Sequence, residues 1–324
     1  MPDPGGPQTA TPQPDRGSQD RRWGDALALP LGLGTNTFGR TTDAAGSHAV
    51  LDRFAAAGGT LVDTADTYSD GAAETILGEW LRDRGNRDRM VVVSKVGNHA
   101  RFDGLAAPVV TAAVDESLRR LGTDHLDLCF AHYQDVETPV EESAVAFDAL
   151  VRAGKVRAYG LSNFDADTVA RWLRAAEEGG LAAPVALQPH YSLVHREPYE
   201  SALAPLAAAS DLAVLPYRAL GGGFLSGKYR TRADTEGRAR GAGVTPLLTP
   251  AGLALLDAVE AVARDHEVAP ASVALAWLRV RPHVVAPLAS ATDATQLDEV
   301  VASSTVELGP DELHRLDEAS ALLG

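Results

Sequence analysis

Residues 90–95 read Met-Val-Val-Val-Ser-Lys, a short apolar run without alternating polar residues that ends in a lysine. Such a run is expected for a strand of a parallel sheet that is covered on both faces, because neither face then meets water. Similar short runs recur along the chain. With this one they give eight expected strands: Leu29–Gly34, Thr60–Asp63, Met90–Lys95, Leu126–His132, Val156–Ser162, Val185–Gln188, Ala213–Tyr217 and Val284–Leu288.

Segments of helical period, rich in Ala, Leu, Glu and Arg, separate these strands. Examples are Ala73–Arg84, Val109–Leu121, Val140–Ala153, Asp167–Glu178 and Tyr199–Ala209. The alternation predicts βα units around a parallel sheet. A doubly wound open sheet would show a similar pattern, but eight units favour an α/β fold of the (β/α)8 TIM-barrel type.

The two ends of the chain and one internal segment depart from this rhythm. Residues 1–24 are rich in Pro, Gly, Gln, Asp and Arg and predict a disordered tail with no signal-peptide core, which leaves residues 25–324 as a single barrel domain. Gly221–Thr249 is too long for an ordinary connection and predicts a flexible lid. Its cations are Lys228, Arg230, Arg232, Arg238 and Arg240. Residues Pro310–Leu323 predict a closing amphipathic helix.

The overall charge excludes some partners. The chain of 324 residues has 44 acidic and 29 basic side chains and a formal net charge of -15, whereas nucleic acids and anionic membranes are bound through basic surfaces. We therefore expect neither as a partner. No window approaches the roughly 18 apolar residues of a membrane span. The one cysteine, Cys129, fits a reducing compartment, so we expect a cytoplasmic protein.

Several expected strands end at, or run into, a residue that can do chemistry. The carboxyl ends of barrel strands meet at one rim, where barrel enzymes place their sites. Taken singly, each such side chain is as well explained by capping a helix or by meeting water. Together they predict a shared site at one mouth of the barrel, formed by Asp63, Lys95, His132, Asn163, Gln188 and Tyr217.

A set of short motifs in a fixed order gives a resemblance to a known family. They are Gly32-Leu33-Gly34-Thr35, Val62-Asp63-Thr64-Ala65-Asp66-Thr67-Tyr68, Ser94-Lys95, Asp127-Leu128-Cys129-Phe130-Ala131-His132, Gly154-Lys155-Val156-Arg157, Leu161-Ser162-Asn163-Phe164, Gln188-Pro189 and Gly223-Phe224-Leu225-Ser226-Gly227-Lys228-Tyr229. Each motif alone is weak. In this order and spacing the chain resembles an aldo-keto reductase over nearly all of residues 28 to 310.

The resemblance implies a catalytic tetrad of Asp63, Tyr68, Lys95 and His132. When a hydride reaches a carbonyl carbon, the oxygen must receive a proton, and a tyrosine with a free pKa of about 10 gives one up poorly. Lys95 is expected to lower the pKa of Tyr68, Asp63 to orient Lys95, and His132 to hydrogen-bond the substrate oxygen.

The resemblance also implies a nicotinamide cofactor. Its carboxamide is expected against Ser162, Asn163 and Gln188, with the ring stacked on Tyr217. Its pyrophosphate is expected beneath the glycine-rich loop that starts at Arg218. The cofactor-binding residues implied are Gly34, Thr35, Asn36, Ser162, Asn163, Gln188, Tyr217, Arg218, Leu220, Gly222, Lys228, Leu288, Ser290 and Gln296.

The adenosine end of this expected site departs from the family. Many relatives read Pro-Gly-x-Arg and later Glu-Asn after the eighth strand, but this chain reads Ala289-Ser290-Ala291-Thr292-Asp293 and then Glu299-Val300. The usual arginine is missing, and Asp293 would repel a 2′-phosphate unless Arg218 or a lid arginine compensates. NADPH remains the expected cofactor, with NADH as the alternative.

The cysteine and the other histidines are not expected to form a metal site or a second catalytic site. A metal site of His125, Cys129 and His132 is rejected, because in a strand the third of these side chains points away from the other two. Cys129 is expected to be a core residue. The remaining histidines have no partnered spacing and are treated as loop or surface residues: His190, His195, His266, His283 and His314.

The sequence thus predicts an NAD(P)(H)-dependent oxidoreductase that reduces a small aldehyde or ketone or runs in reverse. Two alternatives remain open. One is a regulatory barrel that binds the cofactor, as the β-subunits of potassium channels do. The other is a dehydratase or epimerase that reuses Tyr68 and Lys95 as acid and base. The physiological substrate and the oligomeric state do not follow from the sequence.

Overall fold

A computed structural model describes residues 27–323, and the expected disordered tail lies outside the described residues. Within that range the strands are β1 (Gly32–Gly34), β2 (Leu61–Asp63), β3 (Val91–Val96), β4 (Asn98–His99), β5 (Phe102–Asp103), β6 (Leu126–Ala131), β7 (Val156–Ser162), β8 (Ala186–Gln188), β9 (Ala213–Val214) and β10 (Leu288–Ala289). Eight of them form one parallel sheet in the order β10-β1-β2-β3-β6-β7-β8-β9. Strands β4 and β5 form a separate antiparallel hairpin.

The eight-stranded sheet closes on itself. The amide of Val214 in β9 donates to the carbonyl of His283 at 2.8 Å, and the amide of Val285 donates back to Val214 at 3.0 Å. The amide of Leu288 in β10 then donates to the carbonyl of Pro216 at 2.8 Å. The fold is therefore a (β/α)8 barrel, as the sequence predicted.

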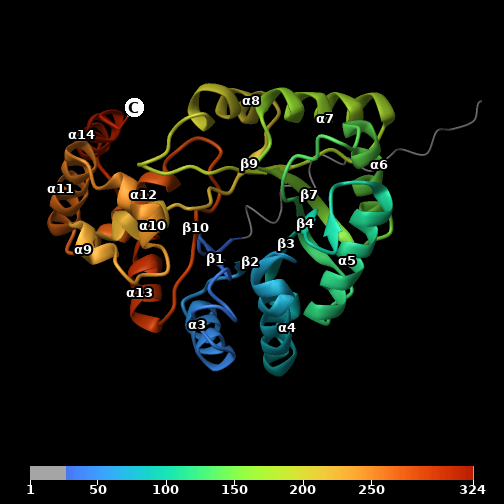
Figure 1. Ribbon diagram of the computed structural model, residues 1–324, viewed down its shortest axis with the longest axis horizontal. Helices are drawn as coiled ribbons and strands as arrows, with labels where there is room; N and C mark the ends of the chain where they lie inside the picture. Colours follow the sequence, from blue (N-terminus) through green and yellow to red (C-terminus); the bar gives the residue numbers. More distant parts are fainter. Residues whose placement is uncertain (1–26, 324) are drawn as a thin grey trace, which may run out of the picture.

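Helices surround the strands on the outside, as Figure 1 shows. They are α3 (Ala44–Ala56), α4 (Ala72–Arg84), α5 (Ala107–Leu121), α6 (Val140–Arg152), α7 (Ala166–Gly179), α8 (Ala204–Ala209), α11 (Pro250–Asp265), α12 (Pro270–Arg279), α13 (Ala294–Ala302) and α14 (Pro310–Ala321). Three of them begin at an aspartate whose side chain accepts a backbone N–H three residues later: Asp43, Asp165 and Asp293.

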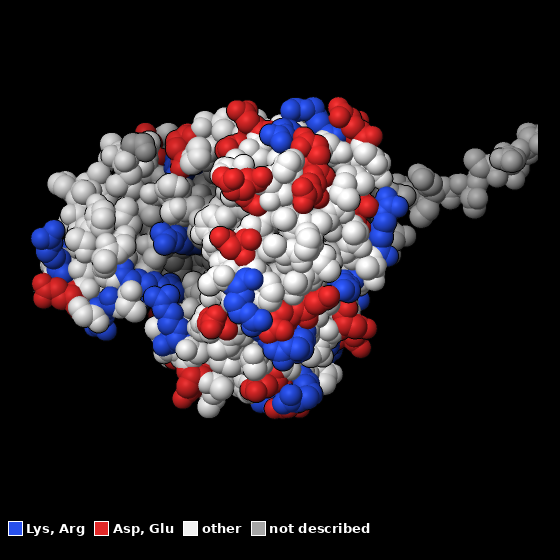
Figure 2. All heavy atoms as spheres, turned by 45° about the vertical axis from the view of Figure 1, so that its right-hand side comes forward, with Lys and Arg blue, Asp and Glu red and all other residues white. Residues whose placement is uncertain are grey.

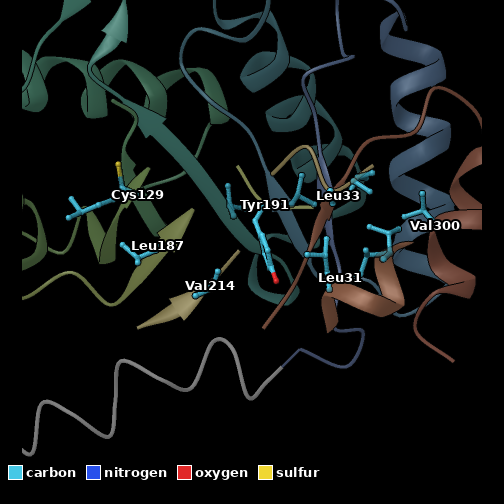
Figure 3. Close-up of a cluster of buried hydrophobic side chains, with 14 of the residues drawn as sticks. Leu31, Leu33, Cys129, Leu187, Tyr191, Val214 and Val300 are labelled. Atoms are coloured by element: carbon cyan, nitrogen blue, oxygen red, sulfur yellow. The ribbon is translucent and has the colours of Figure 1, made fainter. Parts of the chain in front are cut away.

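Two apolar layers explain why the strands are unbroken apolar runs. In β6, Leu128 and Phe130 belong to the inner core of the barrel, whereas Cys129 and Ala131 face the outer core beneath the helices. Figure 3 shows part of this outer core, where Leu33 of β1 and Val300 of α13 are among the labelled side chains. Successive strand residues alternate between the two cores, and the side chains of both are buried.

Several details differ from the sequence prediction. The first and seventh strands are shorter than expected, at three and two residues, and the eighth, Leu288–Ala289, overlaps the expected Val284–Leu288 only at Leu288. The hairpin β4–β5 was not predicted. The segment Gly221–Thr249, expected to be a flexible lid, contains short helices: η4 (Gly221–Ser226), α9 (Arg232–Thr235), α10 (Gly241–Val244) and η5 (Thr245–Leu247). We keep the name lid for residues 221–249.

Among residues 27–323, no single helix is both long and apolar enough to cross a membrane. The segment Gly241–Leu247 passes that test only jointly with α11, and the two are bent by 97° relative to each other.

Candidate active site

The strand pattern itself places a polar layer above the inner core. Leu61, Val93 and Phe130 point into the barrel. Two positions later in each strand, on the same face, come Asp63, Lys95 and His132. The same step of two leads from Ala186 to Gln188 and from Leu215 to Tyr217. One apolar layer thus fills the barrel, and the next layer toward the carboxyl ends carries the chemistry.

A buried lysine lies at the centre of this polar layer. The Lys95 Nζ donates to Asp63 Oδ2 at 2.6 Å, to the carbonyl of Thr64 at 2.8 Å and to the Tyr68 hydroxyl at 3.3 Å. Lys95 is 1% exposed and Asp63 is 3% exposed. The Nε2 of Gln188 donates to the other oxygen of Asp63 at 2.9 Å. The ammonium and its counter-ion are therefore well hydrogen-bonded, as a buried ion pair requires.

The surroundings shift the pKa values of Lys95 and Tyr68 upward. Burial opposes the ammonium, but Asp63 and then Tyr68 outweigh it and raise the pKa of Lys95 above its ordinary range. For Tyr68, burial raises the pKa, while Lys95 lowers it. Lys95 thus acts in the expected direction, but burial of the phenol dominates and the pKa of Tyr68 is raised. The phenol is protonated at neutral pH and available as a donor.

His132 completes the group beside Tyr68. The two rings lie 6.2 Å apart between centroids, at 79° to each other. Burial, with a smaller contribution from the Lys95 charge, lowers the pKa of His132 to about 3, so the ring is neutral. The four residues expected from the resemblance therefore lie together at one rim.

A second group of side chains joins the neighbouring strand ends. The Nδ2 of Asn163 donates to the carbonyl of His132 at 2.9 Å and to Ser162 Oγ at 3.1 Å. The Tyr217 hydroxyl donates to Asn163 Oδ1 at 2.7 Å, and Ser162 Oγ donates to the carbonyl of Gln188 at 3.0 Å. Asn163 has φ +60°, a left-handed conformation that asparagine tolerates better than most residues.

The cofactor-binding residues expected at the other end of the rim are also brought together. Asn36 follows Gly34 and the buried Thr35 after β1. Its Oδ1 accepts from Ser290 Oγ at 2.9 Å and from Arg240 Nη2 of the lid at 3.1 Å. The lid is thus tied to β1 and to the residue after β10 through one amide oxygen.

The remaining expected residues are placed as follows. Leu288 contributes its side chain to the inner core. Leu220 is partly buried and precedes η4, in which Gly222 has φ +71°. Gln296 donates to Asp293 at 2.9 Å, and Asp293 caps α13. The carboxylate of Asp293, which was expected to repel the 2′-phosphate, therefore also caps a helix.

Cations gather around this end of the rim. Lys228 has Arg240 and Arg238 as cationic neighbours and Glu299 and Asp293 as acidic ones, and Arg240 has Arg40 and Arg218 as cationic neighbours. None of these five cations makes an ion pair with a carboxylate of residues 27–323 within the usual distance. Figure 2 shows the surface hollowed beside Lys and Arg side chains. Cations without a carboxylate partner can donate charge-assisted hydrogen bonds to phosphate oxygens, so this end of the rim suits a phosphate group.

The structure corrects the interpretation of two histidines. His190 and His195 were treated as ordinary loop residues, but their rings stack with centroids 3.7 Å apart, and His190 also stacks on Tyr217 at 5.4 Å. Burial, His195 and Arg218 lower the pKa of His190 to about 4. Their spacing of five residues in a loop gave no periodic signal from which the contact could be predicted.

Two buried carboxyl groups behind Lys95 also went unnoticed in the sequence. Asp66 and Glu74 are fully buried, and Arg120 Nη1 donates to Glu74 at 3.1 Å and to the carbonyl of Asp66 at 3.3 Å. Burial, together with Glu74, raises the pKa of Asp66 to about 8, so it is neutral at pH 7. Asp66 stands inside the Asp63-to-Tyr68 motif, which was the available signal.

The fold and this rim define a barrel protein with a buried acid–lysine–tyrosine–histidine group beside a cationic end. A model of the Aldo/keto reductase family matches residues 30–321. The chain belongs to that family, which confirms the resemblance and implies an oxidoreductase as the broad class.

Individual relatives agree with this assignment. The chain is 34% identical to Protein tas of Escherichia coli (strain K12), over 89% of this chain and 92% of that protein. It is 32% identical to Norsolorinic acid reductase stcV of Emericella nidulans, over 89% and 77%. It is 31% identical to a Putative voltage-gated potassium channel subunit beta of Schizosaccharomyces pombe, over 79% and 78%.

The pKa of His132 generates a prediction about stability. Its folded-state pKa of about 3 lies below the ordinary value of 6.5, so the unfolded chain takes up a proton first as the pH falls. The stability that this neutral ring contributes is complete above the ordinary pKa and is lost as the pH falls toward 3. Between about pH 7 and about pH 5 the loss is about 2 kcal/mol.

Urea unfolding at the two pH values measures this loss. In His132→Asn the free energy of unfolding should fall less on acidification than in the wild type, by about that amount. The control is His314→Asn, which changes an exposed histidine of α14. Equal pH dependence in the wild type and His132→Asn would contradict a buried neutral ring.

Proposed function

We propose that the protein is an NADPH-dependent reductase of aldehydes or ketones in the cytoplasm, with Tyr68 as the proton donor. The observation that carries the proposal is the contact of Lys95 with both Asp63 and Tyr68 in a buried rim that includes His132. Such a group can hold a proton at one atom and release it toward an oxygen that gains charge.

The residues present fit a nicotinamide cofactor. Ser162, Asn163 and Gln188 offer amide and hydroxyl groups at the tetrad end, beside the ring of Tyr217, and the cationic end suits phosphates. When bound, the cofactor supplies the hydride that is transferred to or from the substrate carbon. Lys228, Arg240 and the glycine-rich loop after Arg218 would hold its phosphates.

Side chains of the tetrad then orient the substrate and transfer the proton. The ring of His132 is neutral and has one N–H, which orients the substrate carbonyl by donating a hydrogen bond to its oxygen. Tyr68 donates its hydroxyl proton to the same oxygen. Lys95 stabilises the tyrosinate that remains, because its ammonium lies within hydrogen-bonding distance. Asp63, fixed by Gln188, keeps Lys95 charged and in place. The reverse reaction uses the same groups in the opposite order.

The similarity to a channel β-subunit favours one alternative. A regulatory barrel could keep the cofactor site without turning over a carbonyl. The complete and hydrogen-bonded Asp63–Lys95–Tyr68 group supports the enzyme instead. Loss of NADPH absorbance with a panel of aldehydes and ketones separates the two functions, because only the enzyme oxidises the cofactor in a substrate-dependent way.

Replacing Tyr68 by Phe removes only the hydroxyl that donates the proton. We expect kcat to fall by about 100- to 10,000-fold, while the Kd for NADPH, measured by fluorescence titration, stays near the wild-type value. Tyr199→Phe, which removes another phenol hydroxyl in the outer core, is the control. A Tyr68→Phe variant with most of its activity would refute the assignment.

The cationic end predicts which cofactor binds more tightly. We infer that Arg240 replaces the missing arginine after β10, because its guanidinium reaches Asn36 beside Ser290. Arg240→Ala should weaken NADPH binding by about tenfold and NADH binding much less, since only NADPH carries the 2′-phosphate.

Calorimetric titration with both cofactors tests this inference. Arg82→Ala, on the exposed face of α4, is the control for loss of a positive charge. If wild-type protein binds NADH at least as tightly as NADPH, the preference for NADPH is wrong. If Arg240→Ala weakens both cofactors equally, Arg240 does not bind the 2′-phosphate.

A further inference from the structure

The turn that carries Tyr68 has an unusual backbone. Ser69, Asp70 and Gly71 follow Tyr68 with φ values of +52°, +55° and +85°. Only the last is a glycine; the left-handed conformation is costly for serine and less costly for aspartate, which adopts it more often than most residues. Such a turn persists only where the surroundings hold it, so its contacts decide where the phenol lies.

A buried histidine makes one of these contacts from the hairpin β4–β5. The Nε2 of His99 lies 2.8 Å from Asp70 Oδ1. His99 is 3% exposed, whereas the side chain of Asp70 is 90% exposed. On the other side of the ring, Nδ1 accepts the backbone N–H of Arg101 at 3.1 Å. Because Nδ1 accepts, Nε2 carries the proton in the neutral ring and donates to the carboxylate.

The hairpin is itself held against the other catalytic segments. It follows directly on β3, which carries Lys95, and pairs His99 with Phe102 across its two strands. The amide of Leu105, just beyond the hairpin, donates at 2.8 Å to Asp135 Oδ2 in the loop after His132. Gly104 leaves no room beside that carboxylate, since a Cβ there would lie 2.9 Å from Asp135 Oδ2.

Residues 97–105 are therefore joined to three of the four tetrad segments, those of Lys95, His132 and Tyr68. Lys95 is connected through the chain, the segment after His132 through Asp135, and the Tyr68 turn through the His99–Asp70 hydrogen bond. A second contact of the turn is the hydrogen bond that Ser69 Oγ donates to the carbonyl of Phe38 at 2.7 Å.

We propose that His99 is a positioning residue, which sets the place of the Tyr68 hydroxyl through its hydrogen bond to Asp70. The proposal rests on the function proposed above for Tyr68. His99 touches neither the substrate nor the cofactor in this account. Its effect is on the geometry of proton transfer, where a small displacement of a donor has a large kinetic cost.

The test begins with Asp70, because its side chain is exposed and its hydrogen bond to His99 can be removed without emptying space in the core. Asp70→Ala removes the acceptor, and we expect kcat to fall by at least about fivefold with the Kd for NADPH unchanged. Asp70→Asn keeps an oxygen that can accept from Nε2, so it should restore most of kcat. His99→Ala should match Asp70→Ala, and the double variant should lose no more than either single one.

Asp124→Ala is the matched control. Asp124 is also an exposed aspartate, hydrogen-bonded at 2.7 Å to a neighbouring histidine, His125, but it lies in the connection before β6. Its removal should leave kcat unchanged. Hydrogen exchange of residues 67–71 supplies a readout independent of activity and should be faster in Asp70→Ala than in Asp70→Asn or Asp124→Ala.

The outcomes separate this inference from the proposed function. Wild-type protein without carbonyl reduction would overturn the proposed function, and hydrogen exchange would still test the contact. An active wild type whose Asp70→Ala and His99→Ala variants keep full kcat overturns the positioning role. A loss of kcat in Asp70→Ala that Asp70→Asn does not restore also overturns it.

Discussion

The buried ion pair of Lys95 and Asp63 is the constraint on which the site depends. An ammonium removed from water costs several kcal/mol, and it is retained only where a counter-ion and hydrogen bonds offset that cost. Asp63, the carbonyl of Thr64 and the Tyr68 hydroxyl meet this need. Removing Asp63 alone would leave an uncompensated charge in the barrel, at a cost of about 3–5 kcal/mol. The contacts that stabilise the buried Lys95 ammonium thus include the Tyr68 hydroxyl, which they hold next to it.

The barrel accommodates the Lys95–Asp63 ion pair because it places these side chains in a polar layer above an apolar one. Phe130, Val93 and Leu61 fill the interior, and the next inward position of each strand carries a polar side chain. Above this apolar layer, individual side-chain contacts hold the turn after Tyr68 and the lid. Asp63, Lys95 and His132 are thus fixed by strands or strand ends, whereas the Tyr68 turn and the lid are fixed by hydrogen bonds that can be varied one at a time.

The sequence predicted the parts of the site that depend on strand periodicity. Asp63, Lys95, His132 and Gln188 could be placed because each ends a short apolar run. The contacts that were missed join residues in loops, in the lid and in the short hairpin β4–β5. His99 meets Asp70, His190 stacks on His195, and Arg240 reaches Asn36 across 204 positions of chain. No local periodicity encodes such contacts, because they depend on how loops pack after the barrel has closed.

The charge on Lys95 can be measured directly by NMR of its side-chain nitrogen in labelled protein, titrated upward in pH. The ammonium is expected to stay protonated beyond the ordinary lysine pKa of 10.5, because Asp63 and Tyr68 stabilise it. Loss of that proton near neutral pH would mean that burial outweighs the ion pair, and Lys95 could then not stabilise a tyrosinate at residue 68.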